Sequence, residues 1–163
     1  MQLSADQNAL PATEVPAGFI AANVGSGFSS RNAQFYARWA DERLQLGFRV
    51  AEHHTNLRGV LHGGMLATYA DTLMPYAAMY QALAGRHFLP TISLQIDYLA
   101  LAALGAWVQG QADVLRSTRN MVFMQGLVTA DDTPIARLSG IFKIGPAAGE
   151  LDRDFFGIRN NQP

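Results

Sequence analysis

Residues 56–71, NLRGVLHGGMLATYAD, hold the side chains of this sequence that are best placed to do chemistry. A histidine precedes a glycine pair, Gly63 and Gly64, and a lone aspartate, Asp71, follows inside an otherwise apolar stretch. Glycines let a backbone approach a ligand closely, and the N-terminus of a helix presents unpaired N–H groups with a partial positive charge. Such a helix end can stabilise an oxyanion or polarise a carbonyl, although two glycines before a helix are also typical of a plain tight turn.

Asp71 is an unfavourable residue for the position in which it stands. Aspartate is a poor residue for a helix interior, and a buried carboxylate without hydrogen-bond partners costs free energy. Pro75, four residues later, cannot donate to the carbonyl of residue 71 and crowds it, so we expect a kink at this level. A local defect beside a charge is typical of functional sites. The alternative is that Asp71 points into solvent from a surface helix.

The surrounding segments change from one periodicity to another. Residues 63–85 are rich in Ala, Leu and Met, and they predict one long helix, apolar nearly all round and about 30 Å long. Residues 33–40 and 43–51 predict two strands of a hairpin. After the helix we expect four long strands, paired as an antiparallel meander, over 89–101, 106–118, 120–131 and 134–145.

This order of elements predicts an α+β fold, with an antiparallel sheet of about five to six strands wrapped around one long central helix. The open edges of such a sheet are usually closed by a second copy of the chain. We expect a flexible N-terminal arm over 1–30, where Pro, Gly and Ser are frequent, a single domain over 31–146 and an irregular tail over 147–163.

The composition excludes several classes of function. The chain has 163 residues, 49% of them hydrophobic, which suits one domain with a substantial core. A formal net charge of −1 argues against nucleic acid or an anionic membrane as the main partner. The absence of cysteine excludes disulfides, thiolate nucleophiles and thiolate metal ligands. The first residues do not resemble a signal peptide, and no apolar run reaches the about 18 residues of a spanning helix, so we expect a cytoplasmic protein.

A motif of 16 residues, N..G..HGG......D, resembles the signature of hotdog-fold acyl-CoA thioesterases of the phenylacetate-pathway type, within the 4-hydroxybenzoyl-CoA thioesterase superfamily. The residues that carry this resemblance are Asn56, Gly59, His62, Gly63, Gly64 and Asp71. The order of strands and helix extends the likeness over roughly 33–145 and implies the hotdog fold.

The resemblance implies hydrolysis of an acyl-CoA thioester to a free acid and coenzyme A, without a metal or another cofactor. Asp71 would act as general base or nucleophile, and the N–H of Gly63 would polarise the thioester carbonyl. Asn56 would orient the attacking water or the carbonyl, and His62 would shape the loop. A homodimer, or a dimer of dimers, is implied as well, in which Asp71 faces Asn56 and Gly63 of the partner subunit.

Five residues are further candidates for contact with the substrate or the water. Thr91 resembles the position of a hydroxyl that holds the attacking water, and Ser93, on the same strand face, competes with it. Gly64 would let the backbone approach the substrate. Arg116 and Arg119 resemble basic turns that meet the phosphates of coenzyme A, although a solvated turn would look the same.

Two other functions and a metal site deserve comparison. A hydroxyacyl thioester dehydratase of the same fold needs a histidine that works with an acid, and His62 is expected in a loop rather than on the helix. A non-catalytic acyl-thioester-binding dimer has no reason to keep a costly carboxylate at Asp71. A metal site is not expected at His53 and His54, because adjacent histidines on a loop rarely converge with tetrahedral geometry.

Overall fold

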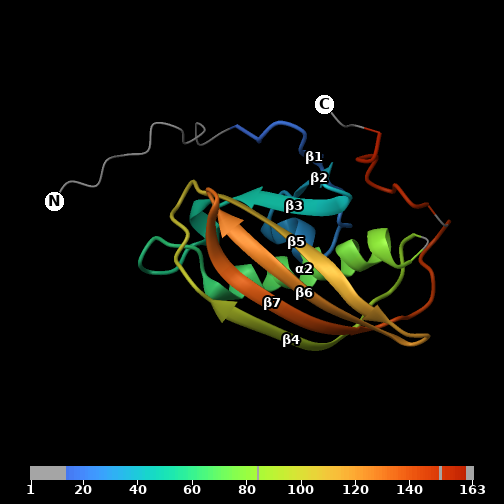
Figure 1. The fold of residues 1–163 in the computed structure, drawn as a ribbon. Helices are drawn as coiled ribbons and strands as arrows, with labels where there is room; N and C mark the ends of the chain where they lie inside the picture. The colour runs from blue at the N-terminus through green and yellow to red at the C-terminus, as the bar shows by residue number, and fades with distance from the viewer. Residues whose placement is uncertain (1–13, 84, 151, 161–163) are drawn as a thin grey trace.

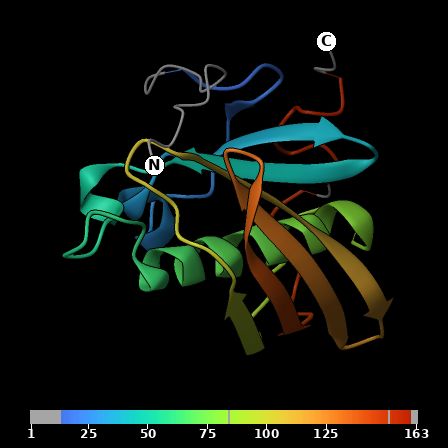
Figure 2. The same cartoon turned by 60° about the vertical axis from the view of Figure 1, so that its left-hand side comes forward.

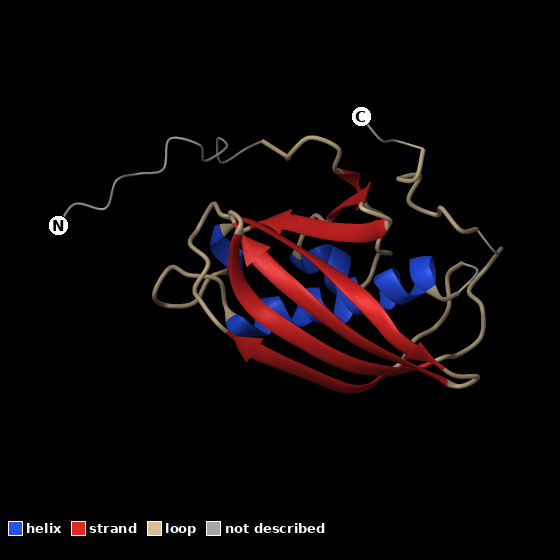
Figure 3. Ribbon diagram, in the orientation of Figure 1, coloured by secondary structure: helices blue, strands red, loops and turns tan. Residues whose placement is uncertain are grey.

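The computed structural model describes residues 14–83, 85–150 and 152–160. One antiparallel sheet wraps around one long helix, as the sequence predicts (Figures 1 and 3). In chain order the elements are β1 (Ile20–Ala21), α1 (Phe28–Asn32), β2 (Tyr36–Ala40), β3 (Arg43–Arg49), a 3-10 turn (Glu52–His54), α2 (Gly63–Gln81), β4 (Thr91–Tyr98), β5 (Trp107–Ser117), β6 (Met121–Ala130) and β7 (Thr133–Lys143).

The seven strands lie in the order β1-β2-β3-β5-β6-β7-β4. The predicted hairpin of β2 and β3 and the antiparallel run from β5 to β7 are confirmed. The predicted meander is wrong for β4, which pairs with β7 at the far edge of the sheet, while β5 pairs with β3. The reason is the length of the connection 99–106, which lets the chain cross the sheet, whereas short turns force neighbouring strands to pair.

The folded part begins earlier than the predicted boundary at residue 31. Ile20 and Ala21 pair with β2, and the flanking Phe19 and Ala22 are buried. These apolar contacts draw the segment onto the sheet, because an exposed phenylalanine would lose the free energy of burial. Residues 1–13 of the predicted arm lie outside the described residues.

The C-terminal segment has no regular secondary structure and packs against the end of α2. Phe156 and Ile158 are buried, and the backbone N–H of Phe156 donates to the hydroxyl of Tyr80 at 3.0 Å. Arg159 donates to the carbonyl of Tyr80 at 2.9 Å. This segment therefore closes the core at the C-terminal end of the helix, away from Gly63 (Figure 1).

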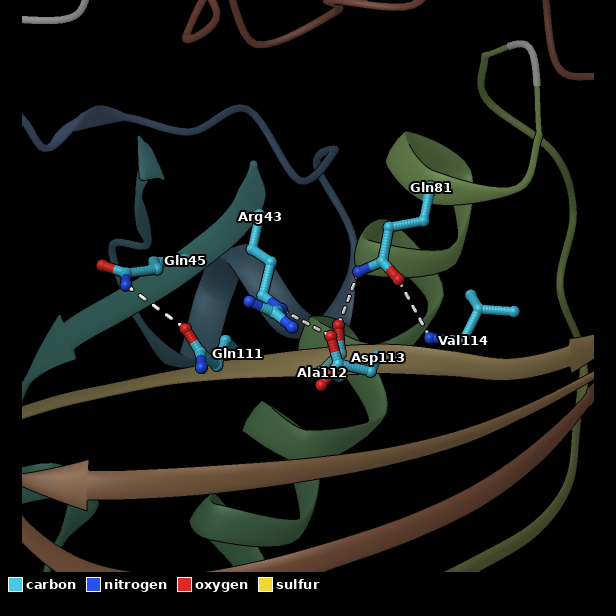
Figure 4. A network of polar contacts seen from close by, with 7 residues as sticks. All are labelled: Arg43, Gln45, Gln81, Gln111, Ala112, Asp113 and Val114. Carbon is cyan, nitrogen blue, oxygen red and sulfur yellow. Dashed lines mark hydrogen bonds and ion pairs between the residues drawn. The ribbon is translucent and has the colours of Figure 1, made fainter. Parts of the chain in front are cut away.

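Helix α2 lies across one face of the curved sheet (Figure 2). Its buried face includes Tyr69, whose hydroxyl donates to the carbonyl of Leu46 in β3 at 2.6 Å. At its last residue the side-chain amide of Gln81 donates to the carbonyl of Ala112 at 2.6 Å and accepts from the N–H of Val114 at 2.9 Å (Figure 4). These bonds hold the last turn of the helix on β5.

Helix α2 is not covered on every side in the single chain. Asp71 and Gly64 are exposed in the single chain, and Ala67 and Thr68 between them are half-buried. The sheet covers the opposite face, and α1 covers only one flank, through a 3.1 Å bond from Thr72 to Ser29. One stripe of α2 therefore stays open.

Helix α2 continues through Pro75, from Gly63 to Gln81, so the kink expected near Asp71 does not end the helix. The helix ends four residues before the predicted stop at Gly85. Among the described residues, no helix combines the length and the hydropathy that a membrane span requires.

Candidate active site at the start of helix α2

The first turn of α2 leaves one backbone N–H without a partner. His62 is the N-cap, and its Nδ1 accepts from the N–H of Gly64 at 2.8 Å. The carbonyl of His62 accepts from the N–H groups of Met65 and Leu66 at 3.0 and 3.1 Å. Within the described residues, the N–H of Gly63 is therefore the free donor of this turn, at the positive end of the helix dipole.

The cap also selects a tautomer for His62. Because Nδ1 accepts a hydrogen bond, the neutral ring carries its proton on Nε2. His62 is exposed, so this Nε2–H faces outward beside the helix start. The histidine thus caps the helix through a bond to the second glycine of the pair.

Asn56 lies in a tight turn that leads to this helix end. Its Oδ1 accepts from the N–H of Arg58 at 2.9 Å, and its backbone pairs with Val60 and Gly59 at 2.9 Å each. Gly59 has a φ of +72°, which explains why a glycine stands there. The Nδ2 amide of Asn56 can donate to a ligand, in a shallow hollow that Asn56 shares with His62.

Asp71 makes one side-chain contact on the open stripe of α2. The hydroxyl of Thr91, the first residue of β4, donates to its Oδ1 at 2.5 Å. A β-bulge separates Thr91 from Ser93 in the pairing of β4 with β7, so the regular alternation of faces is broken here. The structure joins Thr91, and not Ser93, to the carboxylate.

The two halves of the predicted site do not meet within one chain. Gly63 and Asp71 are eight residues apart on one helix, which corresponds to roughly 12 Å along its axis. A single thioester carbonyl cannot touch both, since reacting groups must lie within about 3–3.5 Å. Within one chain the structure brings together Gly63, Gly64, His62 and Asn56 as one group, and Asp71 with Thr91 as another.

Arg116 and Arg119 lie elsewhere. Both are exposed at the β5–β6 turn, which lies near the C-terminal end of α2 and far from Gly63 in the same chain (Figure 1). The side chains of these arginines make no ion pair among the described residues.

One residue near the site escaped the sequence analysis. The hydroxyl of Tyr98, the last residue of β4, donates to the carbonyl of Gly63 at 2.9 Å. In the alternating pattern of β4 this tyrosine looks like another apolar strand residue, and nothing local separates it from Ile96. Only the proximity of the end of β4 to the start of α2 reveals it.

Comparison with known proteins supports the same reading. The family model described as "Thioesterase superfamily" matches residues 58–136, which include the glycine pair, Asp71 and Thr91. The chain is 28% identical to the Pseudomonas aeruginosa protein named "Putative esterase PA0474", over 80% of this chain and 97% of that protein. It is 30% identical to mouse acyl-coenzyme A thioesterase 13, over 52% of this chain and 59% of that protein.

Solved structures share the architecture. Zebrafish thioesterase superfamily member 2 is 27% identical, with a TM-score of 0.60 over 68% of this chain and 81% of that one. A hypothetical thioesterase from Streptococcus pneumoniae, solved with coenzyme A, shares the fold at 17% identity, with a TM-score of 0.62 over 71% of this chain and 92% of that one. Residues 58–136 of the chain thus match the thioesterase superfamily, and the chain shares the hotdog fold of these solved structures.

Proposed function

We propose that this protein hydrolyses an acyl-CoA thioester to a free acid and coenzyme A, at a site that two subunits share. The match of residues 58–136 to the thioesterase superfamily supports thioester hydrolysis in general. The name of the mouse relative and the coenzyme A in the pneumococcal structure support an acyl-CoA as the substrate class. The observation that carries the proposal is the free N–H of Gly63 on the same open helix stripe as the Asp71–Thr91 pair.

Each group has a defined task in the proposed reaction. The N–H of Gly63 donates to the thioester carbonyl, on which negative charge develops as water adds to the carbon. Asp71 takes the proton of that water with one oxygen, while Thr91 holds the other oxygen in place. The amide of Asn56 orients the water or the carbonyl. The C–S bond then breaks, and coenzyme A leaves as a thiolate that takes up a proton.

A two-fold axis would place Gly63 of one subunit next to Asp71 of the other. If two copies of α2 run antiparallel with the axis near Ala67 and Thr68, midway between these residues, each Asp71 faces Gly63 of the partner subunit, because an isologous interface pairs i with j and j with i. The half-buried Ala67 and Thr68 offer a small contact surface there. The exposed edge strand β4, with Ile92 55% exposed, is the natural place for sheet-to-sheet pairing.

Free-thiol release over a panel of aromatic, short-chain and long-chain acyl-CoA substrates tests the proposal. We expect Asp71→Asn to lower kcat by about 10²-fold or more on the preferred substrate, because the proton acceptor is lost. Asp132→Asn is the matched control, since Asp132 is exposed in the β6–β7 turn at a positive φ that asparagine tolerates. Failure to cleave any member of the panel, or full activity of Asp71→Asn, contradicts the proposal. Binding without cleavage would favour a non-catalytic acyl-thioester-binding dimer.

Gly63→Pro tests the oxyanion donor, because proline removes the N–H while its ring fits the first turn of a helix. Position 63 is the first residue of the helix, where proline fits well, and His62 already has the extended ψ of 133° that a following proline requires. We expect kcat to fall by about 10²–10³-fold with little change in melting temperature. Gly63→Ala keeps the N–H, and its added Cβ would lie 3.5 Å from the ring of Tyr98, an ordinary contact. Equal activity of the two variants would refute the donor role of Gly63.

A further inference from the structure

We infer that Tyr98 is a positioning residue, which holds the N–H of Gly63 in the orientation that catalysis needs. The inference rests on the proposed function, because it concerns the same oxyanion donor. Its basis is the hydrogen bond from the Tyr98 hydroxyl to the carbonyl of Gly63 at 2.9 Å.

The peptide group that joins Gly63 to Gly64 is held at both of its polar ends. Its carbonyl oxygen accepts from Tyr98, and its N–H donates to Nδ1 of His62 at 2.8 Å. The preceding peptide is held at its carbonyl by the N–H groups of Met65 and Leu66. Of the four polar groups of these two peptides, the free one among the described residues is the N–H of Gly63.

Such a clamp matters because residue 63 is a glycine. Without a Cβ, the two torsions of a glycine are softer than those of other residues, so its N–H can turn away from a substrate. A donor that must reorient during the reaction loses part of its stabilising effect, whereas a pre-oriented donor does not. The bond from Tyr98 also polarises the peptide and strengthens the bond from Gly64 to His62, since linked hydrogen bonds reinforce one another.

Tyr98 is well anchored for this task. It ends β4, where its backbone pairs with Ala136 of β7, and its ring atoms lie 3.5 Å from the position of a Cβ on Gly63. Thr91 at the other end of the same strand holds Asp71. Strand β4 therefore contacts both Gly63 and Asp71 of its own chain. In the proposed dimer these two residues belong to different active sites.

Tyr98→Phe is the direct test, because it removes the hydroxyl and keeps the ring. We expect kcat to fall by about tenfold, a fraction of the loss that follows deletion of an oxyanion donor, while KM stays within about twofold. Tyr36→Phe is the matched control, since Tyr36 lies in β2 near the opposite edge of the sheet. Unchanged kcat in Tyr98→Phe, beside an impaired Gly63→Pro, would overturn this inference and leave the proposed function standing.

A double-mutant cycle separates positioning from general stabilisation. If Tyr98 acts through the N–H of Gly63, adding Tyr98→Phe to Gly63→Pro should cost no further activity, because the donor is already gone. An equal tenfold loss in both backgrounds would mean that the hydroxyl acts by another route and would overturn the inference. An inert Gly63→Pro would refute the oxyanion role of Gly63, and the positioning role with it.

A spectroscopic readout is independent of turnover. In the ¹⁵N-labelled protein, Tyr98→Phe should move the amide proton of Gly64 upfield, because the peptide loses the polarising bond at its carbonyl. Tyr36→Phe should leave that resonance in place. A Gly64 resonance that is unmoved in Tyr98→Phe would overturn the inference.

Discussion

At the scale of single residues, the proposed chemistry depends on hydrogen bonds that orient the reacting groups and on one N–H donor that stays free for the substrate. The side chain of His62 accepts from the N–H of Gly64, and among the described residues the N–H of Gly63 has no partner. The start of the helix therefore presents one free donor rather than several. Asp71 has one oxygen held by Thr91 at 2.5 Å, and its exposed position leaves the other oxygen accessible. Each half is thereby oriented before a substrate arrives, which is how electrostatic stabilisation becomes effective.

Thr91→Val tests whether the orientation of Asp71 matters. The substitution keeps the branched shape, suits a strand and removes the hydroxyl. We expect kcat to fall by about tenfold with little loss of stability, because an exposed hydrogen bond contributes only about 1 kcal/mol. Thr91→Ser, which keeps the hydroxyl, should restore most of the activity in the thiol-release assay. A valine variant that matches wild type would show that Asp71 needs no such partner.

At the scale of elements, the edge strand β4 is both scaffold and contact surface. Its inner side chains hold α2 at two points, through Thr91 and Tyr98, and its outer edge has no strand beside it in the single chain. An exposed strand edge with apolar side chains tends to pair with another edge. Strand β4 can therefore contact both the proposed active-site residues of its own chain and a second subunit.

Ile92→Lys should separate the subunits. A lysine on an exposed edge opposes strand pairing across a two-fold axis, where two copies of the charge would meet. We expect sedimentation to show a folded monomer with little thiol-release activity. Asn120→Lys, which adds the same charge at the exposed β5–β6 turn, serves as the control. A dimer that persists in Ile92→Lys would exclude this edge as the interface.

The 3-10 turn before the helix makes stability depend on pH. His54 is buried, its Nδ1 accepts from the N–H of Ala51 at 2.9 Å, and its Nε2 contacts the carbonyl of Asn32 at 2.6 Å. Burial lowers the pKa of His54 below its usual value of 6.5, although the bond to Asn32 opposes this shift. The unfolded chain then binds the proton more readily, so this contribution to stability is present above about pH 6.5 and is lost as pH falls through the folded pKa.

Denaturant unfolding between pH 7.5 and 5 measures this effect. We expect the free energy of unfolding to decrease across this range in the wild type, and to decrease less steeply in His54→Gln, which cannot titrate. His87→Gln is the control, because His87 is not among the groups that shift the pKa of His54. Identical slopes in the wild type and in His54→Gln would exclude His54 as the source.

At the scale of the whole molecule, the proposal requires two chains for each site. The roughly 12 Å between Gly63 and Asp71 along one helix is a consequence of helix geometry, and no side-chain rotation removes it. The open stripe of α2 and the exposed edge of β4 lie on the same side of the fold, since β4 contacts α2 through both of its ends.

Complementation between two inactive variants tests the shared site. In a heterodimer of Asp71→Asn with Gly63→Pro, one site holds both substitutions and the other holds neither. Random reassortment of an equal mixture makes half of the dimers mixed, so about a quarter of the wild-type activity should return. Refolding the mixture from denaturant permits the exchange, and each variant refolded alone is the control. A mixture no more active than its components would place each site within a single chain.

Much of this architecture follows from local patterns. The alternation of residues 43–51 and the composition of residues 63–85 predict β3 and α2, because periodicity depends only on which side chains must face a core. The glycine pair and Asp71 stand out for a similar local reason. Glycine and aspartate both lower the stability of a helix, so their presence at these positions indicates a functional role. These inferences need no knowledge of distant contacts.

Long-range tertiary contacts decide the features that local sequence patterns do not predict. The pairing of β4 with β7, the bond from Thr91 to Asp71 and the bond from Tyr98 to Gly63 join residues that lie 20 to 51 positions apart in the sequence. Alternation alone does not choose Thr91 over Ser93, because a β-bulge separates the two. Exposure of Asp71 likewise depends on which helix face the sheet leaves uncovered, and the buried side chains of α2, Tyr69 among them, decide that face. Local sequence specifies which groups can react, whereas long-range packing specifies which of them meet, because only the folded chain brings distant segments within hydrogen-bonding distance.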